Sequence, residues 1–158
     1  MADGTLNNKR LFDGTYRVTP VEGPFETPES KNVDVRGRKV TTVEFTVTPY
    51  ISFSNVSIVR EGLGVRATFT LQKNISSSIP QDYIVFVTPK TPYVGTIAYE
   101  TNLSTGSVSI TNDDFGKPIS VLLSENYESG KTYYVRIGAR CENASGRYNY
   151  TEVVSIQM

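Results

Sequence analysis

The 158 residues contain no histidine and a single cysteine, Cys141. The absence of histidine removes the usual general base near neutral pH and the commonest metal ligand. A single cysteine cannot close a disulfide within the chain. Cys141 lies on the apolar row of a predicted strand, so we expect a buried thiol rather than a reactive one, because free cysteine is among the most buried residue types.

No charge of one sign dominates, because sixteen Lys and Arg residues balance sixteen Asp and Glu residues. Such a chain has no net field to draw it to nucleic acid, to another polyanion or to an anionic membrane. We therefore expect no nucleic-acid partner. No apolar run approaches the roughly 20 residues of a membrane-spanning helix. The first ten residues, MADGTLNNKR, hold no apolar segment typical of a secretory signal.

The groups that enzymes use are also scarce. Asp113 and Asp114 are the only adjacent carboxylates, and neighbouring residues on a loop point apart, so we interpret them as part of a polar turn. With Asn112 they could supply only a few of the roughly six to eight oxygens that calcium needs. The sequence has no Gly-x-Ser-x-Gly, HExxH or phosphate-loop motif. We therefore predict a protein that is not an enzyme, with no cofactor and no metal site.

What the sequence does have is short segments in which apolar and polar side chains alternate. The clearest spans residues 133–141, where every second residue is apolar: Tyr133, Val135, Ile137, Ala139 and Cys141. A period of two places one row of side chains in a core and the other row in water. Residues 142–147, ENASGR, favour a turn, and residues 148–158 resume strand-like sequence. This pattern predicts an antiparallel strand pair.

Similar segments recur along the whole chain. After residue 50 we expect further strands at 51–60, 65–72, 83–87, 97–100, 107–111 and 119–123. With the closing pair these are eight segments, close to the seven strands of an immunoglobulin-like sandwich. Before residue 50 we expect a brief strand at 17–20, a loop at 21–30, and a hairpin that joins 31–35 to 40–47. The predicted fold class is all-β, with negligible helix.

The stretch from Gly130 to Thr151 resembles the F strand, FG loop and G strand of a fibronectin type III domain. In that family a turn glycine is followed by Tyr, two aliphatic residues and Ala at alternate positions. An Asn/Gly-rich loop and an aromatic-Ser/Thr-Glu step come later, matched here by Tyr150, Thr151 and Glu152. The Leu usually found three residues before the turn glycine is Tyr127 in this sequence. The resemblance implies a seven-stranded, fibronectin type III-like β-sandwich over residues 50–158.

Residues 3–50 resemble the second half of a carboxypeptidase-regulatory, or transthyretin-like, sandwich. The match rests on Gly14-Thr15-Tyr16, on Val18, and on the segment from Gly37 to Val47. Proline cannot donate a ladder hydrogen bond, so we place a domain boundary at Pro49 and predict a partial transthyretin-like domain over residues 1–49. The early strands of such a domain have no counterpart ahead of Met1, and open sheet edges are usually avoided. We therefore expect that the sequence begins inside a domain, or that this part docks on the second domain.

The two halves together resemble a two-domain Bacteroidetes lipoprotein family of unknown function. Residues 3–51 carry most of this resemblance, through DGT at 3–5, NN at 7–8, LF at 11–12, GTY at 14–16, EGPF at 22–25 and VTPY at 47–50. The resemblance implies a secreted lipoprotein on the outer-membrane cell surface, held by a lipid anchor that lies outside this sequence. It also implies a non-catalytic role in glycan capture, beside outer-membrane uptake proteins of the starch-utilisation type.

Ten tyrosines and no tryptophan make tyrosine the natural candidate for binding. A tyrosine ring can stack on a sugar or pack at a protein interface, although cross-strand packing is its more frequent role in β proteins. The candidate residues are Tyr93, Tyr134, Arg147, Tyr148 and Tyr150. We expect the loops at 89–93 and 142–148 to lie at one end of the sandwich. The first hypothesis is a monomer that binds polysaccharide or an uptake-complex protein, and the alternative is a structural spacer or adhesion module without a small-molecule ligand.

Overall fold

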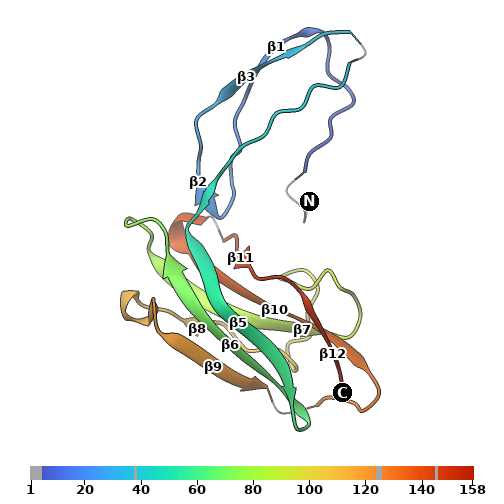
Figure 1. The fold of residues 1–158 in the computed structure, drawn as a ribbon, viewed down its shortest axis with the longest axis vertical. Helices are drawn as coiled ribbons and strands as arrows, with labels where there is room; N and C mark the ends of the chain where they lie inside the picture. Colours follow the sequence, from blue (N-terminus) through green and yellow to red (C-terminus); the bar gives the residue numbers. More distant parts are fainter. Residues whose placement is uncertain (1–4, 38, 124–125, 145) are drawn as a thin grey trace.

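The computed structural model describes residues 5–37, 39–123, 126–144 and 146–158, and over these residues the fold is all-β, as predicted (Figure 1). The strands are β1 (Gly14–Val18), β2 (Phe25–Glu26), β3 (Lys31–Val35), β4 (Thr48–Pro49), β5 (Ile51–Glu61), β6 (Gly64–Lys73), β7 (Pro80–Thr88), β8 (Val108–Ser109), β9 (Pro118–Leu123), β10 (Thr132–Cys141), β11 (Asn149–Tyr150) and β12 (Val154–Gln157). The helical content of this part of the chain is two single turns of 3₁₀ helix, η1 (Asn112–Asp114) and η2 (Glu142–Ala144). The acidic pair at 113–114 thus lies in a polar turn.

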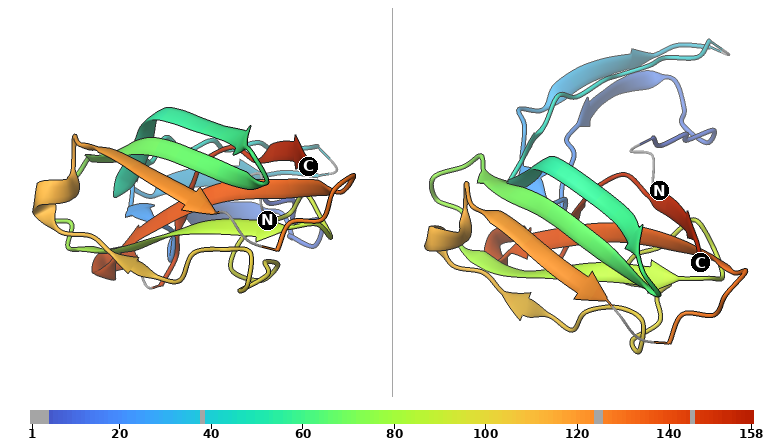
Figure 2. Two further views of the ribbon diagram at one scale, coloured as in Figure 1. Left: turned by 90° about the horizontal axis from the view of Figure 1, so that it is seen from below. Right: turned by 60° about the horizontal axis from the view of Figure 1, so that its bottom comes forward.

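Two antiparallel sheets form a sandwich after residue 50. One sheet has the order β5-β6-β9, and the other has the order β11-β10-β7-β8, with β12 also paired to β10. Figure 2 shows the two sheets as separate layers, with β5, β6 and β9 on one side and β7 and β10 on the other. This division of strands is the one expected of a fibronectin-like sandwich.

The core between the sheets is built from the predicted inward rows. On β6, Val65, Ala67, Phe69 and Leu71 are fully buried, and on β10 the alternate residues from Tyr133 to Cys141 are at most 1 % exposed. Period-two burial on facing strands gives each sheet one apolar face, and the two faces pack together. The thiol of Cys141 is buried in this core and forms no disulfide, which confirms that prediction.

A tyrosine corner closes the sandwich just before β10. The hydroxyl of Tyr133 accepts a hydrogen bond from the amide of Glu128 at 2.8 Å, so a buried ring holds the chain that leads into the strand. Tyr127, which stands where leucine is usual, packs edge-on against Tyr133 with 4.9 Å between ring centres. The substitution therefore keeps an apolar contact with the core.

The first fifty residues pair differently from the prediction. β3 pairs with β1, not with residues 40–47, so the predicted hairpin is wrong. Side chains along 40–47 do alternate, with Val43, Phe45 and Val47 half-buried and the residues between them exposed, but no ladder forms there. Instead the amine of Lys31 donates to the Glu44 carbonyl at 2.7 Å, which takes up an oxygen that a ladder would use. Alternation fixes which face is buried but not which neighbour the backbone bonds.

Two further predicted strands, and the expectation that Pro49 interrupts strand pairing, differ from the structure. The strand expected at 97–100 is wrong. Residues 97 and 98 belong to a tight turn, which is closed by a bridge between Gly95 and Ala98. The strand expected at 107–111 is reduced to β8. Pro49 does not interrupt pairing but lies in β4, opposite Phe25, and a two-residue edge strand tolerates proline. Among the described residues, every buried hydrophobic side chain lies at or after Ile51.

Candidate functional site

The outer face of the β7–β10–β11 sheet carries a second apolar cluster. Sequence alternation predicted that this row of β10 faces water, but Tyr134, Arg136 and Arg140 are half-buried and Gly138 is buried. The cause is that the rings of Tyr148 and Tyr150 cover Arg140, Gly138 and Arg136, and the loop of residues 89–104 packs Val94 and Tyr99 against the same face. We call this group the outer cluster; its buried members are Ile84, Phe86, Val94 and Tyr148, and Tyr99, Tyr134, Tyr150 and Val153 pack around them.

Hydrogen bonds and one ring contact hold the loop in place. The amide of Glu100 donates to the Val87 carbonyl at 2.8 Å, and the amide of Thr105 donates to the Val85 carbonyl at 3.1 Å. The Tyr99 ring meets Phe86 edge-on with 5.2 Å between centres. The loop is therefore attached to β7 by its backbone as well as by its side chains.

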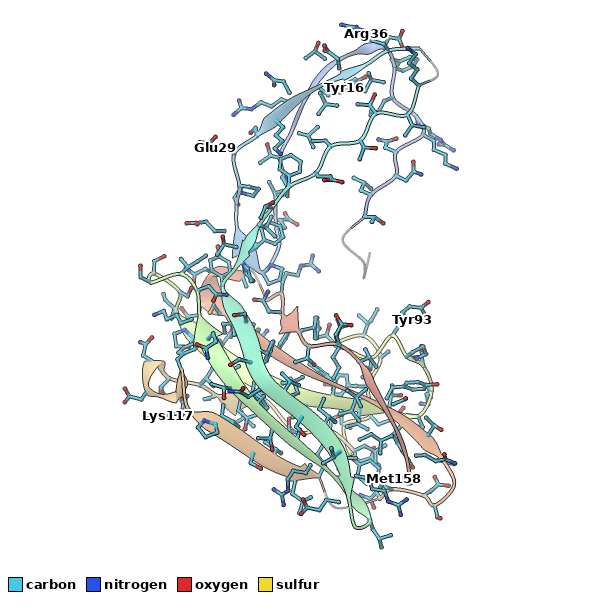
Figure 3. All side chains as sticks on the ribbon, in the orientation of Figure 1. Tyr16, Glu29, Arg36, Tyr93, Lys117 and Met158 are labelled. Carbon is cyan, nitrogen blue, oxygen red and sulfur yellow. The ribbon has the colours of Figure 1, made fainter. Side chains whose placement is uncertain are left out.

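Residues 93–98 form a small projection on this loop, which we call the Tyr93 hairpin. Gly95 and Ala98 exchange two backbone hydrogen bonds of 3.3 and 3.0 Å, which leaves Thr96 and Ile97 at the tip. Val94 is only 1 % exposed and anchors the hairpin in the outer cluster, whereas Tyr93 is 74 % exposed and Ile97 is 97 % exposed. Figure 3 shows Tyr93 on the outer side of the loop, pointing away from the two sheets.

Tyr150 supports the hairpin from β11. Its hydroxyl accepts a hydrogen bond from the amide of Thr96 at 3.4 Å, and a side chain on Gly95 would lie 3.3 Å from that hydroxyl. The Arg136 guanidinium stacks on the Tyr150 ring, 4.4 Å from its centre, and its Nε donates to the Thr151 carbonyl at 2.7 Å. Burial lowers the pKa of Arg136. The ring of Tyr150 is thus fixed in position by the cation as well as by the hairpin.

A polar network lies at the other edge of the outer cluster. Asp82, which is 4 % exposed, accepts two hydrogen bonds from Arg140, at 3.0 and 2.9 Å, and others from Tyr148 and Ser107. Burial raises the pKa of Asp82, but the hydrogen bonds from these three residues outweigh it, so the pKa is lowered. Burial and the Asp82 carboxylate raise the pKa of Tyr148. We call Asp82, Ser107, Arg140 and Tyr148 the Asp82 network. Its hydrogen bonds compensate the buried charge of the Asp82 carboxylate.

A groove of about 480 Å³ lies between β5 and the β11–β12 segment. Phe53 and Val56 line it from β5, and Tyr150 and Glu152 line it from the other side. Asn149 also lines the groove, and its side-chain oxygen accepts a hydrogen bond from the amide of Ile51 at 3.3 Å. Tyr150 lines the groove and its hydroxyl contacts the Tyr93 hairpin, so the two features have this residue in common.

The structure brings three of the five predicted site residues, Tyr134, Tyr148 and Tyr150, together in the outer cluster, and it leaves Tyr93 and Arg147 outside it. Tyr93 is exposed and Tyr134 and Tyr150 are half-buried, but Tyr148 is only 7 % exposed because it completes the Asp82 network. A ring so buried has no face free for stacking. Arg147 is exposed in the loop after η2.

The loops of Tyr93 and Arg147 leave opposite ends of the β7–β10 pair. Thr88 at the end of β7 pairs with Tyr134, whereas Cys141 at the end of β10 pairs with Pro80. The prediction that both loops lie at one end of the sandwich is therefore wrong. In an antiparallel pair the loop that follows one strand and the loop that follows its partner leave from opposite ends.

Sequence reasoning missed Ile97 and Glu152 as members of the site. Residues 97–100 were interpreted as a strand, although Gly95-Thr96 immediately before them is the kind of signal that marks a turn. Glu152 was used only as a mark of the fibronectin-like step. Among the described residues, no group of three or more His, Cys, Asp and Glu is placed to hold a metal ion.

Comparison with known families agrees with this fold. Residues 51–155 match the family "Domain of unknown function (DUF3823_C)". The chain belongs to the DUF3823_C family. No curated protein matches it. In the part of the DUF3823_C chain that the structure describes, no helix has the length and apolar character to cross a membrane.

Solved structures similar to this chain include three from Bacteroides species. A DUF3823 family protein from Bacteroides uniformis is 22 % identical, with a TM-score of 0.76, and the match covers 99 % of this chain and 79 % of that one. One from Bacteroides ovatus is 21 % identical, with a TM-score of 0.71 over 94 % and 77 % of the two chains. A "putative carbohydrate binding protein" from B. uniformis is 23 % identical, with a TM-score of 0.71 over 96 % and 77 %. Neither the family nor these three structures is described as an enzyme.

Proposed function

We propose that the protein is a non-catalytic binding protein for glycan, with the Tyr93 hairpin as its sugar platform. One observation carries this proposal. Of the ten tyrosines, all of which the structure describes, Tyr93 alone is exposed, and it is held on a hairpin that is anchored by Val94 and by Tyr150. An exposed aromatic ring on a pre-formed support loses little conformational freedom when it stacks on a ligand.

The groups around the ring suit a sugar. A pyranose presents an apolar C–H face and a rim of hydroxyls, which match an aromatic face and nearby polar side chains. Thr91 and Thr96 lie two and three positions from Tyr93 in the chain, and Asn149 and Glu152 line the groove beside Tyr150. The relative named as a "putative carbohydrate binding protein" has the same fold, which supports the proposal.

A cell-surface location, a monomeric state and a division of the chain at Pro49 belong to the same proposal. The resemblance to a lipoprotein family motivates the first. The start of the buried core at Ile51 supports the division, since residues 5–50 contribute no buried side chain among those described. Protease shaving of intact cells of the source organism tests the location: loss of the protein from intact cells is expected, and full protection would contradict it.

A glycan screen tests the binding role. The purified protein is run by affinity electrophoresis through gels that contain single polysaccharides, with albumin as the non-binding control. Retardation by at least one polysaccharide is expected, with no release of reducing sugar from it on prolonged incubation. Retardation by none would contradict the glycan role, and release of sugar would contradict the non-catalytic one.

A second function is favoured by Ile97, which is 97 % exposed at the tip of the hairpin. An aliphatic side chain in that position contributes nothing to the fold and suits an apolar pocket on a partner protein, such as another component of an uptake complex. In that case the protein is a structural spacer or adhesion module. Co-purification of a neighbouring gene product by the wild type but not by Ile97→Asp, together with no retardation by any polysaccharide, would favour this reading.

A further inference from the structure

The charge of the groove restricts the class of glycan that fits it. None of the described residues that line the groove is Lys or Arg, and Glu152, which is exposed, is the charged residue among them. The rest of the lining is apolar, aromatic or neutral and polar, for example Phe53, Tyr150 and Asn149. A ligand in this groove therefore meets one negative charge and no positive charge from the lining.

Two cations close to this site, Lys90 and Arg136, already have partners. Lys90, on the loop that carries the Tyr93 hairpin, forms an ion pair with Glu100 at 2.7 Å. Arg136 lies against the ring of Tyr150 and donates through Nε to the Thr151 carbonyl, so it is not part of the groove lining. Recognition of a uronate or sulfate needs a free guanidinium or ammonium group, preferably one that makes paired hydrogen bonds.

We propose that the groove, together with the Tyr93 hairpin, takes a neutral glycan and rejects acidic ones, and this inference rests on the proposed function. Glu152 accepts hydrogen bonds from sugar hydroxyls. The side-chain amide of Asn149 donates to them, and the ring of Tyr93 contacts an apolar sugar face. Hydrogen bonds to a carboxylate are among the stronger ones available to a hydroxyl. The same carboxylate repels a uronate or sulfate placed at this site.

A panel of matched polysaccharides tests this. Neutral chains (amylopectin, xyloglucan, galactomannan, laminarin) and acidic chains (polygalacturonate, alginate, chondroitin sulfate, heparin) are compared by affinity electrophoresis at about 0.15 M salt, where long-range attraction is screened. At least one neutral chain is expected to retard the protein, and no acidic chain. Retardation by any acidic chain overturns the neutral-glycan inference and leaves the glycan-binding function standing. If none of the eight polysaccharides retards the protein, both the proposed glycan-binding function and the neutral-glycan inference are wrong.

Variants at Glu152 test its role on the neutral chain that binds. Glu152→Gln removes the charge and keeps the shape, so affinity should fall about threefold to tenfold, which is the effect of weakening one charge-assisted hydrogen bond. The affinity of Glu152→Lys for the neutral chain should fall at least as far, and its affinity for polygalacturonate should rise. Glu128→Gln is the matched control. It removes an exposed carboxylate that pairs with Lys131, and Glu128 does not line the groove. Unchanged affinity in both Glu152 variants would overturn the assignment of Glu152.

Discussion

The hydroxyl of Tyr148 donates a hydrogen bond to Oδ1 of Asp82 at 2.8 Å, and both residues are more than 90 % buried. The two lie 66 positions apart in the chain, so this bond ties β7 to the segment that leads into β11. The Arg140 guanidinium stacks on the same tyrosine, 4.8 Å from the ring centre. Tyr148 is therefore a structural residue of the outer cluster.

We predict that Tyr148→Phe lowers the free energy of unfolding by about 1–2 kcal/mol, because a buried carboxylate loses one of its donors. Urea denaturation at neutral pH measures the change. Tyr93→Phe removes the same hydroxyl from an exposed ring and should leave stability within about 0.5 kcal/mol of the wild type. Equal effects of the two variants would show that the Tyr148 hydrogen bond does not stabilise the fold.

Acid should weaken the Asp82 network. The folded-state pKa of Asp82 is lowered, so its contribution is fully present above its unfolded pKa of about 4 and is lost as pH falls through the lower folded value. We predict that Asp82→Asn is less stable than the wild type at pH 7 by about 2–4 kcal/mol, because Arg140 and Tyr148 lose a charged acceptor. The difference should shrink when urea denaturation is repeated between pH 4 and pH 2. A difference that stays constant over that range would contradict the assignment.

Gly138 lies beneath three aromatic rings. A Cβ atom there would come within 2.8 Å of Phe86, 2.9 Å of Tyr150 and 3.1 Å of Tyr148. Gly138→Ala should cost about 1–3 kcal/mol by overpacking. Because it displaces the ring that supports the Tyr93 hairpin, it should also weaken glycan binding. Gly106→Ala is the matched control, since nothing lies within 4 Å of its added Cβ, and it should unfold at the wild-type urea concentration. Overpacking would be excluded by identical urea midpoints for the two variants.

Cys141 should be inert in the native protein. Its side chain is fully buried in the core, and burial raises the pKa of the thiol, so little thiolate is present and little of it is accessible. Labelling with a maleimide at pH 7 should be at least about a hundredfold slower in buffer than in 8 M urea, as expected when reaction requires opening of the core. Rapid labelling in buffer would show that the end of β10 is open.

The sequence was sufficient for the rows that form the core and insufficient for what lies outside it. The inward rows of β6 and β10 could be predicted because β-branched and aromatic residues recur there with a period of two. Residues 40–47 show the same period, yet β3 pairs with β1 and not with them. Periodicity carries no information about which two strands form hydrogen bonds with each other.

The candidate site was predictable only in part. Tyr93 stands in a proline-rich loop, and local sequence is enough to suggest an exposed position. Whether that loop is anchored depends on Val94 and Tyr150, which meet only in the folded chain. The burial of Tyr148 likewise depends on Asp82, which no local pattern connects to it. The outer cluster is a long-range arrangement, so alternation in β10 alone indicated a solvent-facing row.

The central claim is that Tyr93 forms the sugar platform, and affinity electrophoresis of Tyr93→Ala over the polysaccharide panel tests it most directly. Leu63→Ala is the control, because Leu63 is also exposed, at 76 %, but lies in the turn between β5 and β6. We predict that at least one polysaccharide retards the wild type and Leu63→Ala equally, and that Tyr93→Ala binds it about tenfold more weakly, a loss of about 1.4 kcal/mol. Equal retardation of Tyr93→Ala and the wild type on every polysaccharide that binds would contradict the account.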